Sequence, residues 1–184
     1  MGLDRQARRA PGTSGPIQGG YRCRACARAR CLARRRLILF LDACAVIYLI
    51  ESEAACHARV VTTLRDLRQR FPNARLGVSR LSLLECLVKP MRDDATELIA
   101  EYRAFFAADD LLVVELDARV VELALRLRAG DGLRTPDALQ AASALTLPPD
   151  GHRFLTNDRR FARIDGLRVI DLGAAPRRDP ADPA

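Results

Sequence analysis

Residues 37–50 read LILFLDACAVIYLI, and this stretch predicts the architecture of the domain that it opens. Residues 37–41 are all apolar, which is typical of a parallel strand buried on both faces of a sheet. The apolar run stops at Asp42, and residues 43–51 are expected to form a helix. A buried strand that passes through an acid into a helix indicates an α/β fold, with Asp42 at the carboxyl end of the strand.

Strands and helices continue to alternate as far as residue 170. Further strands are expected at 75–78, 111–114, 153–155 and 167–170, and helices at 57–70, 80–88, 93–106, 117–130 and 135–147, with a short helix after residue 158. Ser79 is expected to cap one helix, Pro90 to stop it, and Thr135 to cap another that has Pro136 at its first position. This order predicts a three-layer α/β/α domain around a mostly parallel sheet.

The positive charge of the chain is concentrated in its N-terminal segment. The 184 residues carry a net charge of +7, but residues 1–36 hold ten arginines and one acid, so the rest is close to neutral. Proline and glycine interrupt this segment, which predicts an Arg-rich disordered tail, or else a stretch upstream of the true start. We therefore expect one domain over residues 37–172 and a second disordered tail over residues 173–184.

Several classes of protein are disfavoured by what the sequence lacks. It has no Walker A run, GxGxxG, HExxH or nucleophile elbow, so the standard nucleotide-binding, zincin and serine-hydrolase interpretations fail. The apolar run 37–50 is shorter than the ~20 residues that span a bilayer, so we expect no membrane segment and a cytoplasmic protein. Cys23, Cys26 and Cys31 lack a nearby fourth ligand for zinc.

Four acids occupy positions at which an α/β sheet builds a site: Asp42, Glu85, Asp137 and Asp158. Asp42 and Asp158 each follow an expected strand, Asp137 lies in the first turn of a helix, and Glu85 lies in an apolar helical stretch. Ligands bind beyond the carboxyl ends of parallel strands, so Asp42 and Asp158 would converge if their strands are neighbours.

Each acid also has a purely structural interpretation. Asp42 and Asp158 could serve as N-caps, and Asp137 could complement a helix dipole. Glu85 could pair with Lys89 one helical turn away. From the residues alone, the prediction is an α/β domain with a candidate acidic site.

Four segments around these acids resemble the PIN domain, and within it the VapC-like toxin ribonucleases of bacterial toxin–antitoxin pairs. The segments are LILFLDACAVIYLI at 37–50, VSRLSLLECLVKPMR at 78–92, GLRTPDALQAASAL at 132–145 and FLTNDRRF at 154–161. They stand in the order of the family. The resemblance implies an α/β/α fold whose acids bind Mg²⁺ or Mn²⁺ and cleave RNA endonucleolytically.

By this resemblance, Asp42, Glu85, Asp137 and Asp158 are the metal-binding and catalytic acids. Clustered carboxylates repel one another, and a divalent cation would neutralise them and activate a water for attack on a phosphodiester. The products would be a 3′-hydroxyl and a 5′-phosphate. The family usually has Ser, Thr or Asn where this chain has Cys44, and a thiol is a poorer partner for a hard cation.

An acidic pocket alone would repel RNA, so neighbouring polar and basic side chains are expected to hold the substrate. The candidates are Arg134, Arg159, Arg160, Thr156 and Asn157. The resemblance also implies a cognate antitoxin and a homodimer. Two alternatives stay open: a catalytically degenerate PIN-like interaction module, and an Arg-rich protein that binds nucleic acid through its tail.

Overall fold

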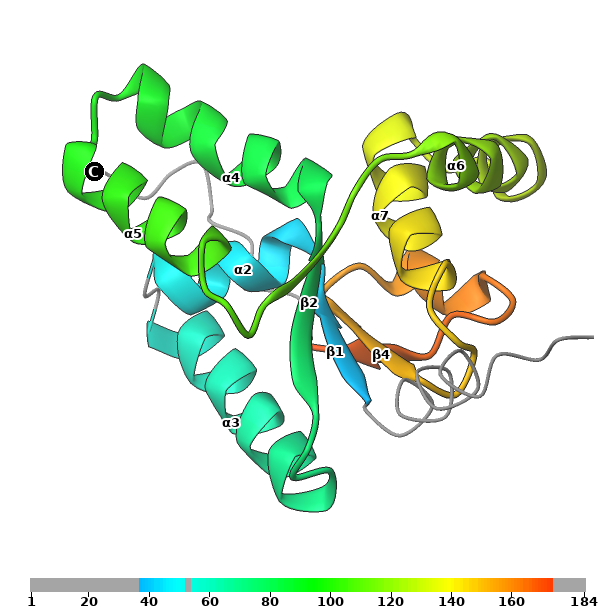
Figure 1. Ribbon diagram of the computed structural model, residues 1–184, viewed down its shortest axis with the longest axis horizontal. Helices are drawn as coiled ribbons and strands as arrows, with labels where there is room; N and C mark the ends of the chain where they lie inside the picture. Colours follow the sequence, from blue (N-terminus) through cyan, green and yellow to red (C-terminus); the bar gives the residue numbers. More distant parts are fainter. Residues whose placement is uncertain (1–36, 52–53, 174–184) are drawn as a thin grey trace, which may run out of the picture.

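Five parallel strands form the central sheet in the computed structural model, which describes residues 37–51 and 54–173 (Figure 1). In spatial order they are β3 (Leu112–Val114), β2 (Arg75–Ser79), β1 (Ile38–Leu41), β4 (His152–Thr156) and β5 (Val169–Asp171). The helices are α2 (Ala43–Ile50), α3 (Ala54–Arg70), α4 (Arg80–Arg92), α5 (Thr96–Phe106), α6 (Ala118–Asp131), α7 (Thr135–Leu145) and the 3-10 helix η1 (Arg159–Arg163). The predicted α/β class is confirmed.

Helices cover both faces of the sheet and confirm the three-layer α/β/α architecture (Figure 1). The four residues of β1 are all buried, and they alternate between the two layers. Leu39 and Leu41 pack with residues of α2 to α5, whereas Ile38 and Phe40 pack with residues of α6 and α7. β1 is therefore buried on both faces, as its continuous apolar run predicts.

The order of the strands reverses beside β1. The chain passes from β1 to β2 and β3 on one side of the sheet, and returns to β4 and β5 on the other. Leu41 of β1 is in register with Leu155 of β4, so the ends of these two strands lie side by side. Such a reversal is the position at which open α/β sheets bind their ligands.

The predicted boundary between α4 and α5 is wrong. α4 does not stop at Pro90 but continues to Arg92, with the proline buried in its last turn. A proline there removes only one backbone hydrogen bond before the helix ends at its C-cap Asp93, and burial of the ring offsets the loss. Asp94 then adopts a left-handed φ of 49°, so α5 begins at Thr96 and not at residue 93.

The start of α7 also differs from the prediction. Its N-cap is Arg134, and Thr135 is already helical. The Thr135 hydroxyl instead accepts a hydrogen bond of 2.7 Å from Arg128 Nη1 of α6. α6 itself passes Gly130 and ends at Asp131, and Gly132, with a φ of 67°, forms the left-handed cap that glycine favours.

The other elements lie within three residues of their predicted bounds. The predicted tails lie outside the described residues, except for Gly173, and so do Cys23, Cys26 and Cys31. Within residues 37–51 and 54–173, no helix is long and apolar enough to cross a bilayer.

Candidate active site

Asp42 lies where β1 passes into α2, and hydrogen bonds hold both of its carboxylate oxygens. Oδ1 accepts from the backbone N–H of Ala43 at 2.8 Å, which confirms the N-cap interpretation. Oδ2 accepts from Thr156 Oγ1 at 2.8 Å and from Cys44 Sγ at 3.3 Å. Asp42 is only 9% exposed, so these donors hold the carboxylate in one orientation.

Thr156 joins the ends of the two central strands. It is the last residue of β4 and is fully buried. Its hydroxyl donates to Asp42 and accepts from the backbone N–H of Asp158 at 3.1 Å. Asp42 and Asp158 thus converge, as expected for acids that follow neighbouring strands. This hydroxyl is buried and has both of its hydrogen-bond partners within the protein.

Glu85 is half-buried in α4 and is bonded to α7. Its Oε2 accepts a hydrogen bond of 2.6 Å from Nε2 of Gln140. The alternative pairing with Lys89 is wrong, because Lys89 Nζ lies 4.0 Å from Asp93 Oδ2 instead. This hydrogen bond therefore holds the side chain of Glu85 at the boundary between α4 and α7.

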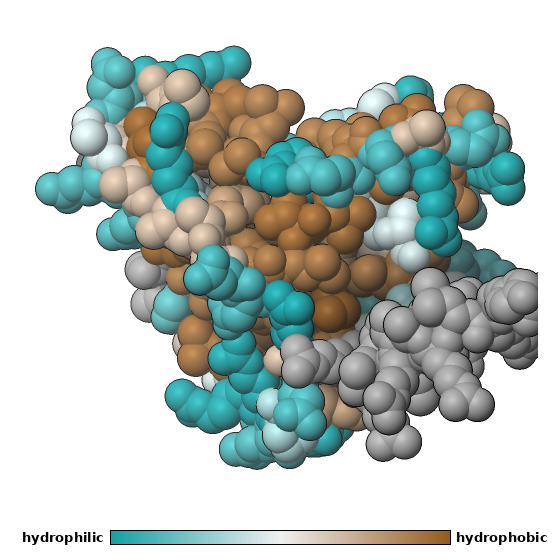
Figure 2. Space-filling model, viewed as in Figure 1, coloured by the Kyte–Doolittle hydropathy of each residue, from teal (hydrophilic) through white to brown (hydrophobic). Residues whose placement is uncertain are grey.

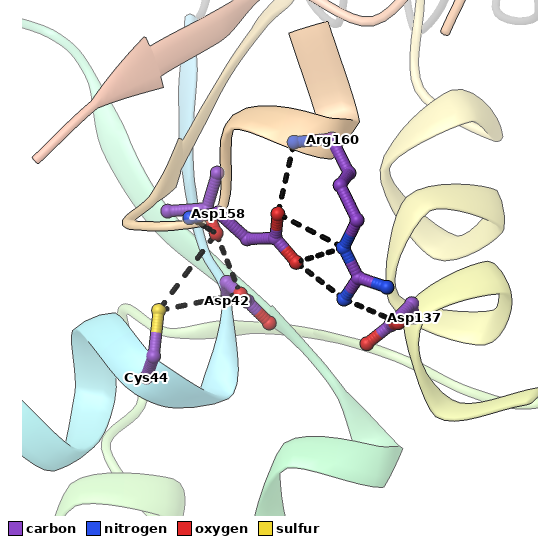
Figure 3. A network of polar contacts seen from close by, with 6 residues as sticks. Asp42, Cys44, Asp137, Asp158 and Arg160 are labelled. Atoms are coloured by element: carbon purple, nitrogen blue, oxygen red, sulfur yellow. Dashed lines mark hydrogen bonds and ion pairs between the residues drawn. The ribbon is translucent and has the colours of Figure 1, made fainter. Parts of the chain in front are cut away.

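Arg160 connects the two remaining acids (Figure 3). Its Nε lies 2.8 Å from Oδ2 of Asp158, and its Nη2 lies 2.9 Å from Oδ2 of Asp137. Asp158 also caps η1 by accepting from the backbone N–H of Arg160, so its N-cap interpretation is confirmed too. Hydrogen bonds from the guanidinium keep the pKa of Asp158 below its usual range.

The charges of the predicted acids influence the pKa values of Asp42 and Glu85. Burial raises the pKa of Asp42, hydrogen bonds from Thr156 and Cys44 lower it, and the charge of Asp137 raises it further. Burial also raises the pKa of Glu85, and the charges of Asp42 and Asp137 add to this effect. The negative charges of Asp42 and Glu85 are therefore unfavourable until a cation lies nearby.

The chemistry of this donor set fits a hard divalent cation, for which carboxylate oxygens are the preferred ligands. In the described part of the chain, however, no group of three or more His, Cys, Asp or Glu side chains is arranged so that it could hold a metal ion. Other partners occupy these acids: Asp42 accepts from Thr156, and Arg160 pairs with Asp137 and with Asp158. The acids are gathered, but they are not arranged as a closed metal site.

The other predicted substrate-binding residues have different surroundings. Arg134 is exposed at the start of α7, one turn before Asp137. Arg159 is exposed and pairs with Asp171 Oδ2 at 3.0 Å. Asn157 donates from Nδ2 to the hydroxyl of Tyr48 in α2.

The sequence alone did not indicate two polar side chains that contact the acids. Gln140 contacts Glu85, and its signal in the sequence is a long polar side chain between the alanines of α7. In the sequence, Cys44 stands out only because the family usually has Ser, Thr or Asn there, yet its thiol donates a hydrogen bond to Asp42. Burial raises the pKa of this thiol, and the charge of Asp42 raises it further, so Cys44 stays protonated and remains a donor.

Apolar side chains are exposed on α4 and on α6. On α4 they are Leu84, Val88 and Met91, and on α6 they are Val121 and Leu125. The face in Figure 2 has apolar surface on the side of α4 and on the side of α6 and α7, with a hollow between them. Exposed apolar groups of this kind are typical of surfaces that contact another protein.

Comparison with protein families gives a match to the PIN domain over residues 39–167, a range that contains all four predicted acids. No curated protein sequence matches the chain.

Solved structures with similar folds include three toxin–antitoxin complexes. A chain in the structure of VapBC2 from Rickettsia felis bound to a promoter DNA fragment is 20% identical, with a TM-score of 0.57, and the match covers 73% of this chain and 98% of that one. For a toxin–antitoxin complex from Klebsiella pneumoniae, the identity is 18%, the TM-score 0.54, and the coverage 73% and 97%. For VapBC-1 from nontypeable Haemophilus influenzae, the identity is 20% and the TM-score 0.55, and the match covers 74% of this chain and 98% of that one.

Proposed function

The chain belongs to the PIN domain family, and we propose that it is a metal-dependent endoribonuclease that acts as the toxin of a toxin–antitoxin pair. The observation that carries this proposal is the cluster of Asp42, Glu85 and Asp137, whose negative charges act on one another beside the end of β1. Carboxylates that repel one another in this way favour a divalent cation.

Three acids would hold the cation, and other side chains would hold those acids. Asp42, Glu85 and Asp137 are the proposed ligands of Mg²⁺ or Mn²⁺, and Asp158 contributes through Arg160. When bound, the cation would supply a water of lowered pKa and stabilise the charge that develops on the phosphate. Thr156 keeps Asp42 in its orientation and links it to Asp158.

Arg160 is placed to exchange partners when the site is loaded. Without a cation, its guanidinium neutralises Asp137 and Asp158. A cation would take over the charge of Asp137, and the guanidinium would then be available to RNA phosphates, which it binds in a bidentate manner. Arg134, Arg159 and Asn157 are further candidates for substrate contacts near the acids.

The proposed reaction is hydrolysis of the RNA backbone. A water oxygen forms a bond to phosphorus, and the bond from phosphorus to the 3′ oxygen breaks, which leaves a 3′-hydroxyl and a 5′-phosphate. Neither histidine takes part. His152 is buried within β4, and Nδ1 of His57 lies 3.0 Å from the carbonyl oxygen of Leu49.

The partners in this proposal are an antitoxin and a second copy of the chain, in the cytoplasm where RNA is available. The exposed apolar side chains of α4 and α6 support contact with another protein (Figure 2). Toxin–antitoxin complexes among the similar structures agree with an antitoxin as one such protein.

RNA cleavage by the full chain tests the proposal. The substrates are tRNAs and ribosomal RNA fragments, incubated with Mg²⁺ or Mn²⁺, with EDTA, and with the variant Asp137→Asn as the control. Discrete cuts that need both the cation and Asp137, with 5′-phosphate ends, are expected. Binding of Mn²⁺, measured by calorimetry, provides a readout that does not depend on finding the right RNA.

A catalytically degenerate interaction module is the second candidate, and it is favoured by the lack of a closed metal arrangement among the described acids. It predicts neither Mn²⁺ binding nor cleavage, with Asp137→Asn indistinguishable from the wild type in both assays. Cleavage that needs a cation but persists in Asp137→Asn would contradict both candidates, because it would place the chemistry elsewhere.

A further inference from the structure

A buried polar seam runs along the boundary between α4 and α7. It consists of Ser79, Ser82, Gln140 and Ser143, and each of these residues is at most 2% exposed. Ser79 Oγ and Ser143 Oγ lie 2.9 Å apart, and Gln140 Nε2 lies 3.0 Å from Ser82 Oγ. The seam is polar where the rest of the buried surface of α7 is alanine: Ala138, Ala141, Ala142 and Ala144.

Gln140 is the member of this seam that reaches the acids. Its Nε2 donates to Glu85 Oε2 at 2.6 Å, while Ser82 Oγ lies within hydrogen-bond distance of both ends of the amide. Because an ionised carboxylate only accepts, the amide nitrogen of Gln140 must face Glu85. Within the described residues, this is the hydrogen bond that Glu85 receives, and its Oε1 receives none.

The placement of Glu85 needs such a contact. Glu85 lies on a helix outside the sheet, whereas Asp42 is held at a strand end by Ala43 and Thr156. A glutamate has three rotatable bonds, so it can turn into solvent and away from Asp42 and Asp137, whose charges repel it.

We propose that Gln140 is a positioning residue of the metal site, whose buried amide keeps the carboxylate of Glu85 beside those of Asp42 and Asp137. This inference rests on the proposed metal-dependent function. Gln140 would not touch the cation or the RNA, and it acts through Glu85. Residues that orient metal ligands in this way typically change metal affinity by about 10–100-fold when they are replaced.

The test is Mn²⁺ binding to the full chain by isothermal titration calorimetry. Gln140→Met keeps a side chain of similar length but removes the amide, and it is expected to weaken Mn²⁺ binding by about 10–100-fold. Cleavage at saturating Mn²⁺ should recover to within a few-fold of the wild type, because the ligand itself is intact. In a Glu85→Gln background, Gln140→Met should have no further effect on Mn²⁺ affinity.

Ser143→Ala is the matched control, because Ser143 belongs to the same seam but does not contact Glu85. It should leave the Mn²⁺ affinity within about twofold. Ser82→Ala removes only the contact between Ser82 and Gln140, and it is the milder variant if Gln140→Met unfolds in EDTA. It is expected to weaken Mn²⁺ binding by several-fold.

Wild-type affinity in both Gln140→Met and Ser82→Ala would overturn the inference while leaving the nuclease intact. Equal weakening in Ser143→Ala would also overturn it, because the effect would then come from packing. If the wild type itself binds no Mn²⁺ and cuts no RNA, the proposed function falls, and this inference with it.

Discussion

Arg160 and Asp137 stand 23 positions apart in the sequence and are joined by an ion pair of 2.9 Å between Nη2 and Oδ2. The same guanidinium also pairs with Asp158, so one cationic side chain faces two of the four acids (Figure 3). Arg160 is 46% exposed at its side chain, and it can therefore leave this position without unfolding the core.

Replacing Arg160 should strengthen metal binding, because the arginine and the cation compete for Asp137. An exposed ion pair contributes about 0.2–1 kcal/mol. Arg160→Gln is therefore expected to tighten Mn²⁺ binding by about 1.4–5-fold in calorimetry, while slowing RNA cleavage at saturating Mn²⁺. Arg159→Gln is the matched control, since Arg159 pairs with Asp171 instead of the acids, and it should leave the Mn²⁺ affinity unchanged. Equal or weaker affinity in Arg160→Gln would contradict the competition.

The hydroxyl of Thr156 should contribute measurably to stability. Thr156→Val keeps the shape of the side chain but removes one of the three donors to Asp42 and leaves the N–H of Asp158 without its acceptor. An unsatisfied buried polar group costs about 1–3 kcal/mol, so the free energy of unfolding in urea should fall by about that amount. Thr156→Ser retains the hydroxyl and should lose less. A Thr156→Val protein as stable as the wild type would mean that water replaces these contacts.

The layers and the sheet were predictable because a strand buried on both faces leaves a continuous apolar run, as β1 does. The end of α4 and the start of α5 were not, because they depend on the burial of Pro90 and on the left-handed backbone at Asp94. The local sequence pattern indicates neither the burial of Pro90 nor the backbone conformation of Asp94. The same holds for Thr135, whose hydroxyl is taken by Arg128 from the preceding helix.

Part of the candidate site was also predictable from topology. Asp42 and Asp158 follow strands that proved to be neighbours, and this adjacency brought them together. The contacts of Arg160 with Asp137 and of Gln140 with Glu85 were not predictable, because they join residues 23 and 55 positions apart across different helices. No spacing rule for a single helix or strand describes such pairs.

The thiol of Cys44 should react slowly. Burial raises its pKa above the ordinary value of about 8.5, and the charge of Asp42 raises it further, so little thiolate is present at pH 8. Alkylation by iodoacetamide, followed for each cysteine by peptide mass mapping, should be at least about tenfold slower at Cys44 in the folded chain than in urea. Asp42→Asn should speed the reaction by removing the charge. Equal rates in folded and unfolded chains would contradict a protonated, hydrogen-bonded thiol.

His152 is a second buried titratable group, away from the acids. It is fully buried in β4, and its Nδ1 lies 3.1 Å from the carbonyl oxygen of Pro148. Its Nε2 is buried with no hydrogen-bond partner among the described residues. Burial keeps the pKa of His152 below its ordinary value, because the charged imidazolium is poorly solvated there.

Stability should therefore fall as the pH drops below about 6.5, the pKa of an unfolded histidine. In that range, the unfolded chain binds a proton that the folded chain does not, and one such proton costs up to about 1.4 kcal/mol per pH unit. The free energy of unfolding in urea, measured at pH 7.5 and 5.5, should drop by less in His152→Gln than in the wild type. Asp42 and Glu85 have raised pKa values that act in the opposite direction, but they are common to both proteins and cancel in the comparison. A drop in His152→Gln as large as the drop in the wild type would contradict the assignment of this pH dependence to His152.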